Sequence, residues 1–148
     1  MFKPLAAAQA RPMTEYVFAV AGATGAWFIA AAILFFNKPV DTLYRSEESH
    51  PAVRNLPQNP GTIGKILGAV AVQCALWAGV YQLVDEALPG GVIGKGLTFG
   101  LIVIALKVVP RDVDRVLLTT YPSRRMTVEF IVGSICAFVV GIVFAAIF

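Results

Sequence analysis

The stretch Val17–Phe36 reads VFAVAGATGAWFIAAAILFF and contains no charged side chain. An α-helix rises about 1.5 Å per residue, so a stretch of this length can cross the roughly 30 Å hydrocarbon core of a bilayer. We therefore predict a transmembrane helix here. Asn37, Lys38 and Pro39 follow directly, and we expect them to end the helix.

Three more apolar stretches follow, at about residues 66–84, 91–109 and 127–148. The 148-residue chain is 57% hydrophobic and only 14% charged, whereas about a quarter of the residues in a soluble domain are charged. The sequence therefore predicts an all-α polytopic membrane protein, with four transmembrane helices in one transmembrane domain covering residues 1–148. Because the connection at residues 89–91 (Pro-Gly-Gly) is so short, spans two and three are expected to be antiparallel neighbours.

The polar segments between the spans carry weaker signals. Residues 37–61 are expected to form a loop, irregular over Asn55–Gly61 because each proline restricts itself and its predecessor. Thr62 is expected to cap the second span. Residues 110–120, PRDVDRVLLTT, place charged and apolar side chains on opposite helical faces. They predict a short amphipathic helix lying on the membrane surface.

The charge distribution predicts an orientation. Nine of the twelve Lys and Arg residues flank the first and third connections. By the positive-inside rule these long loops are cytoplasmic and both termini lie outside, as in a bacterial inner membrane. The net charge of +3 is too small, and too scattered, to indicate a nucleic-acid partner. The tail before the first span does not resemble a cleaved signal peptide, although Met13 is an alternative start to Met1.

Lys95 lies within the third apolar stretch, only twelve positions before Lys107. An ionisable side chain inside a bilayer suggests a function and needs a partner. Asp85 and Glu86, at the same end of the neighbouring span, are the natural candidates. The alternative is that Lys95 extends outward to the membrane–water interface.

Glu129 in the fourth span follows Arg125 by one helical turn, so the two are expected to pair. We interpret this pair as part of an interfacial belt that includes Lys107, with a proton or cation relay as the alternative. Gln73, in the middle of the second span, is expected to hydrogen-bond to another helix. A transport path would require Lys95, Glu129 and Gln73 to face one cavity.

Two further sets of residues are candidates for contacts with lipid or protein. Arg111 and Arg115 share a helical face, and clustered cytoplasmic cations attract anionic head groups. The candidate lipid-head-group contacts are therefore Arg111, Arg115, Arg124 and Arg125. Small residues four apart let another helix approach closely, whether it belongs to this bundle or to a partner. In the fourth span these residues are Gly133, Ala137, Gly141 and Ala145.

Catalytic and metal-binding patterns are not found. His50 is the only histidine, and Cys74 and Cys136 lie in separate apolar stretches, where we expect buried, inert thiols. We therefore expect no metal, no cofactor and no enzymatic activity.

Three functional hypotheses remain. The first is a non-catalytic accessory or scaffolding subunit of a larger membrane complex, whose partners are membrane lipids and other membrane subunits or copies of itself. The second is a small oligomeric transporter or channel that uses Lys95 and Glu129. The third is an integral-membrane enzyme acting on lipids or quinones, for which a nucleophile or base is missing.

Overall fold

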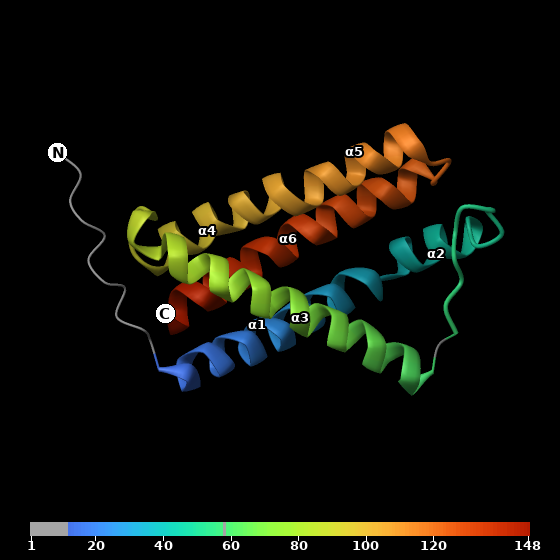
Figure 1. The fold of residues 1–148 in the computed structure, drawn as a ribbon. Coiled ribbons are helices and arrows are strands. Elements are labelled where there is room, and N and C mark those ends of the chain that lie inside the picture. Colours follow the sequence, from blue (N-terminus) through green and yellow to red (C-terminus); the bar gives the residue numbers. More distant parts are fainter. Residues whose placement is uncertain (1–11, 58) are drawn as a thin grey trace.

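The structure, a computed structural model, describes residues 12–57 and 59–148, and within these it contains helices and no strand. Four helical segments are long and apolar enough to cross a membrane (Figure 1). They are α1 (Met13–Phe35), α3 (Pro60–Val84), the continuous segment from α4 to α5, and α6 (Ser123–Ile147). The predicted all-α membrane fold is thereby confirmed. The expectations for the tail before the first span concern mainly residues 1–11, which lie outside the described residues.

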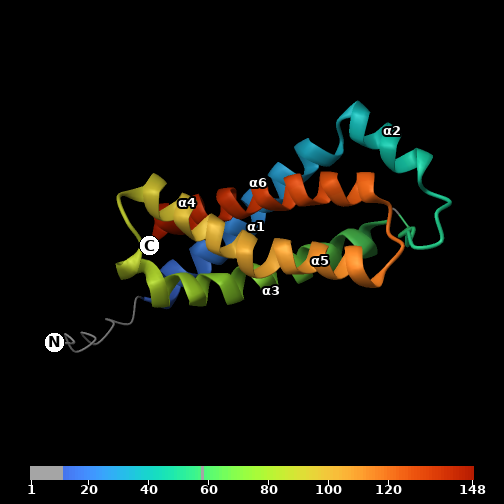
Figure 2. The same cartoon turned by 90° about the horizontal axis from the view of Figure 1, so that it is seen from above.

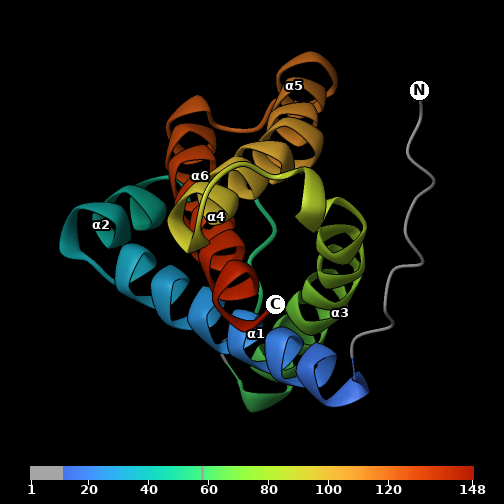
Figure 3. The same ribbon diagram turned by 90° about the vertical axis from the view of Figure 1, so that its left-hand side faces the viewer.

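Helix α6 is the centre of the bundle. It packs against α4 on one side and against α1 on the other, and α3 packs against α1 and turns its buried side chains toward α4 and α6 (Figure 3). Spans two and three are expected to be antiparallel neighbours, and their side chains do meet, at Tyr81 and Phe99 and at Gln73 and Lys107, although their backbones pack more closely on other helices. A 3-10 turn, η1 (Asp85–Ala87), and Gly90, with a φ of 77°, connect the two spans. The positive φ at Gly90 is readily adopted only by glycine.

The third span continues without a break into the segment that was predicted to lie on the membrane surface. Helix α4 (Val92–Val103) passes through the π-helical turn η2 (Ile104–Val108) into α5 (Val109–Leu118) (Figure 2). Pro110 explains the turn, because proline has no N–H and its ring displaces the carbonyl four residues earlier. The Val109 N–H donates to the Ile104 carbonyl, five residues back. The amphipathic segment is helical, but it extends the third span instead of forming a separate surface helix.

The predicted loop at residues 37–61 contains a helix, α2 (Lys38–Ser46). Asn37 caps it, since its side-chain oxygen accepts from the Val40 N–H at 3.1 Å. The proline in the first turn is compatible with a helix start, where its missing N–H costs no hydrogen bond. The same arrangement begins α3, where Asn59, and not Thr62, is the cap: the Thr62 N–H donates to Asn59 Oδ1 at 2.8 Å.

Glycines allow α4 and α6 to cross closely. A methyl group at Gly96 would lie only 2.7 Å from the Cα of Ile142, and one at Gly141 would meet the backbone of Gly96. The remaining small residues predicted in α6 also face inward, since Ala137 and Ala145 are buried and Gly133 faces Val108. The predicted stripe therefore packs within this chain.

An aromatic cluster fills the end of the bundle near the C-terminus of α6. Tyr81 and Phe99 pack edge to face with ring centroids 4.9 Å apart, and Phe144 lies 6.0 Å from Phe99. All three side chains are fully buried. The three rings form part of the main hydrophobic core at this end of the bundle.

The first part of α3 diverges from the other helices (Figure 1). Residues 60–69 are exposed or only half-buried, and Val70 is the first buried residue of the helix. Gly64 and Gly68 have no atom within 4 Å of where a Cβ would be. This segment therefore has little packing within the chain.

Candidate functional site

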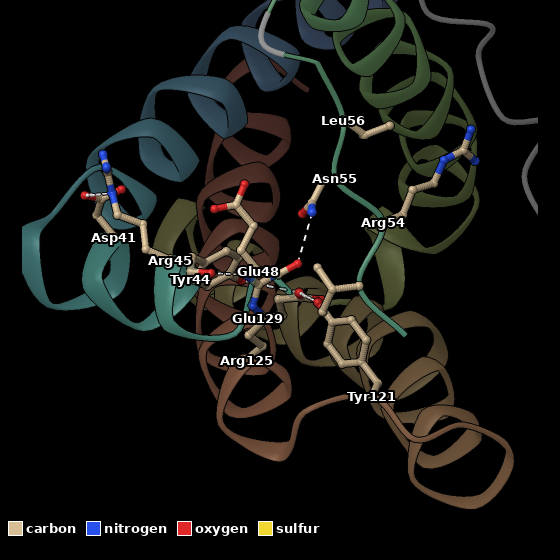
Figure 4. Close-up of a pocket in the computed structure, with 11 residues that line it drawn as sticks. Asp41, Tyr44, Arg45, Glu48, Arg54, Asn55, Leu56, Tyr121, Arg125 and Glu129 are labelled. Carbon is tan, nitrogen blue, oxygen red and sulfur yellow. Dashed lines mark hydrogen bonds and ion pairs between the residues drawn. The ribbon is translucent and has the colours of Figure 1, made fainter. Parts of the chain in front are cut away.

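A cavity of about 610 Å³ lies where α2, the segment after it and the start of α6 meet (Figure 4). We call it the polar cavity, because most of its walls carry charged or hydrogen-bonding side chains. Its lining residues are Asp41, Tyr44, Arg45, Glu48, Val53, Arg54, Asn55, Leu56, Tyr121, Arg125 and Glu129.

Glu129 is held in the wall of this cavity by three donors. Tyr44 donates to its Oε1 at 3.3 Å, Tyr121 donates to the same atom, and Arg115 binds Oε2. Burial, and then the nearby negative charge of Glu129, raise the pKa of the Tyr44 phenol. Burial and the hydrogen bond to Glu129 raise the pKa of Tyr121. Both phenols therefore stay neutral donors to the carboxylate at physiological pH.

Arg125 does not make the predicted pair with Glu129. Its side chain is only 7% exposed, and it lies under α2. The guanidinium carbon lies 4.3 Å from the centre of the Tyr44 ring, and Nη2 donates to the Tyr44 carbonyl. Arg125 Nε is also 3.6 Å from Glu47 Oε2. The prediction failed because α2 and the residue that follows it, which supply these partners, were expected to be part of a loop.

Three cations four residues apart, which we call the cation row, point from the third span toward the bundle: Lys107, Arg111 and Arg115. Arg111 Nε lies 2.8 Å from Asp112 Oδ1, and its Nη2 donates to the Glu129 carbonyl at 3.4 Å. Arg115 binds Glu129 and lies 3.9 Å from Asp112. The two arginines are therefore balanced by carboxylates of this chain.

Lys107 has a different environment. Its ammonium donates to the side-chain oxygen of Gln73 on α3, a neutral group. Gln73 lies at the middle of the 25-residue α3. Its amide forms a hydrogen bond to another helix, as the sequence predicted. In the part of the chain that the structure describes, Lys107 forms no ion pair with a carboxylate.

Lys107 and Gln73 line a small pocket of about 60 Å³, which we call the midspan pocket. Cys74 and Cys136 also line it, although their positions in the sequence gave no sign that they share a site. Both thiols are buried. The other lining residues are Trp27, Val70, Trp77, Val103, Val108, Arg111, Gly133, Ala137 and Val140.

Lys95 lies at the opposite end of the bundle. Its Nζ is 2.7 Å from Asp85 Oδ1, and the Asp85 side chain is 8% exposed. Glu86, the other candidate partner, is exposed. Gly96, next to Lys95, packs on Ile142, which is thirteen residues and about 20 Å along α6 from Glu129. The structure therefore does not bring Lys95 and Glu129 into one cavity.

The four arginines predicted to contact lipid head groups do not form one open basic face. Arg124 is exposed, whereas Arg125 is buried under α2 and the other two bind Asp112 or Glu129. Sequence reasoning also missed Tyr44, Tyr121 and Asp112. The i, i+3 spacing of Asp112 and Arg115 was the one available signal.

Comparison with protein-family models, with curated proteins and with solved structures finds no match to this chain. Among residues 12–57 and 59–148, no group of three or more His, Cys, Asp or Glu side chains could hold a metal ion. The function of the chain is therefore inferred from its packing and side-chain chemistry.

Proposed function

We propose that this protein is a non-catalytic accessory or scaffolding subunit of a larger membrane complex. The diverging start of α3, residues 60–69, carries the proposal. Its apolar side chains are exposed, and Gly64 and Gly68 face open space. A glycine inside a helix costs about 1 kcal/mol relative to alanine, and in this chain the two glycines gain no packing in return. A second helix that approaches closely along them would supply that packing.

The pairing of charged side chains within the chain supports the same proposal. Lys95 is paired with Asp85 and Arg115 with Glu129, so the charges of Lys95 and Glu129 are each balanced within the chain. The alternative, a small oligomeric transporter using Lys95 and Glu129, has less support because the two residues lie in separate clusters.

The proposed setting is a bacterial inner membrane with the polar cavity on the cytoplasmic side. Support for this orientation comes from the excess of Lys and Arg around residues 37–61 and 107–125. Among the four arginines predicted to contact lipid, exposed Arg124 is then the best placed to meet an anionic lipid head group.

Extraction in a mild detergent at native expression level, followed by a native gel and mass spectrometry, tests the proposal. A stoichiometric larger partner is the expected result, and a lone homo-oligomer would contradict it. Gly68→Leu should remove the chain from the complex. Gly25→Leu is the matched control, because Gly25 on α1 is equally open. If neither substitution changes co-migration, the face on α3 is not the docking face. The same conclusion follows if both substitutions reduce co-migration equally.

A further inference from the structure

A groove of about 540 Å³ lies on the surface of the bundle between α3 and the π turn η2. We call it the lateral groove; its lining residues are Gln73, Leu76, Trp77, Val80, Leu106 and Lys107. Gln73, Trp77 and Lys107 also line the midspan pocket, so the groove leads to that pocket from the side. In a bilayer the flank of a span faces lipid chains. A molecule dissolved in the membrane can therefore reach Lys107 without crossing water.

The positive charge of Lys107 indicates that such a molecule carries a negative charge. The described residues that line the midspan pocket and the lateral groove include no carboxylate. The nearest acidic groups along the cation row, Asp112 and Glu129, already bind Arg111 and Arg115. An ammonium at this depth with only a neutral amide beside it is costly, and an anionic ligand would remove that cost.

The size and lining of the two spaces limit the class of ligand further. A pocket of about 60 Å³ has room for a few water-sized groups, which suits a carboxylate and not a glycerophosphate head group. The groove beside it is apolar, with Leu76, Val80 and Leu106 along it. Since the oxygen of Gln73 is occupied by Lys107, its NH₂ group is left to donate to an acceptor.

We propose that the lateral groove and the midspan pocket bind a long-chain carboxylate from the membrane. Its carboxylate accepts hydrogen bonds from the Lys107 ammonium and the Gln73 amide, and its chain lies against Leu76, Val80, Leu106 and the Trp77 ring. The π turn supports this assignment, because Lys107 lies inside it and π turns recur at functional sites. The site uses no residue of the diverging segment 60–69, so it is independent of the docking face proposed above.

Contact quenching of tryptophan fluorescence tests the proposal directly. The chain has two tryptophans, and both Trp27 and Trp77 line the midspan pocket. Dibromostearate, whose bromines quench by contact, is added to the purified full chain in lipid nanodiscs. Its methyl ester, which partitions into the bilayer without a charge, is added in parallel. We expect the acid to quench at a concentration at least about tenfold lower than the ester, as the loss of a charge-assisted hydrogen bond implies.

The same measurement on variants assigns the effect to the lysine. Lys107→Met should raise the half-quenching concentration of the acid to that of the ester, whereas Lys107→Arg should largely keep the preference. Lys38→Met, which removes an exposed cation outside the site, should behave as the wild type. Equal quenching by acid and ester in the wild type would overturn the proposal, and so would an unchanged preference in Lys107→Met. If Lys107→Met does not fold, the wild-type comparison decides alone.

Discussion

The crossing of α4 and α6 predicts that Gly96→Ala destabilises the bundle. The added methyl carbon would lie 2.7 Å from Ile142 Cα, whereas carbon atoms in contact prefer about 3.5–4.0 Å. The helices must therefore separate by about 1 Å, which forfeits up to half of the contact energy at the crossing. Overpacking of this kind costs about 1–3 kcal/mol. The helix propensity of alanine returns up to about 1 kcal/mol, so we expect a net loss of about 1–2 kcal/mol.

The measurement is the free energy of unfolding in mixed detergent micelles, with unfolding monitored by circular dichroism. Gly79→Ala is the matched control, because a methyl group added at Gly79 on α3 would have no atom within 4 Å. The same substitution there should be neutral or stabilising by up to about 1 kcal/mol. If Gly96→Ala is as stable as the wild type, or if Gly79→Ala is equally destabilising, the close crossing is not what holds α4 to α6.

Three further predictions concern the charged groups. Glu129→Gln should lower the free energy of unfolding by about 2 kcal/mol. The loss is smaller than for a fully buried pair, because the Arg115 side chain is 30% exposed and still has Asp112 nearby. An unchanged stability would contradict the role of Glu129. The raised pKa of Tyr121 means that the unfolded chain loses this proton first, so stability present below about pH 10 falls as the pH rises further. Unfolding at pH 9 and pH 11 should therefore show a larger loss in the wild type than in Tyr121→Phe, and equal losses would refute the assignment. A double-mutant cycle of Lys95→Met and Asp85→Asn should give a coupling of about 1–2 kcal/mol, and a coupling near zero would show that the 2.7 Å pair adds nothing.

The sequence was sufficient for the spans, because crossing a bilayer depends on length and summed hydropathy, which are local properties. It also indicated the small residues of α6, although it left open whether they pack within the chain. It placed Lys95 near the right carboxylate, since the short connection at residues 89–91 brings their ends of the two spans together.

Other features depended on tertiary structure that no single segment reveals. Helix α2 was missed because Asn37 and Pro39 were interpreted as a helix end, although an Asn cap with a proline in the first turn also begins a helix. That error hid the partners of Arg125. The shared pocket of Cys74 and Cys136 depends on how α3 and α6 approach each other, and their separate apolar stretches contain no information about it.

The π turn at Ile104–Val108 has a consequence for how the third span serves two neighbours. The glycines of α4 must face α6 at one level of the membrane, and the arginines of α5 must face Glu129 at another level. One residue turns an α-helix by about 100°, so a single extra residue between the two levels resets their relative orientation. Deleting Ala105 would force the helix to satisfy either the glycine crossing or the arginine contacts. The number of residues in the π turn thus sets the rotation of α5 relative to α4 about the helix axis.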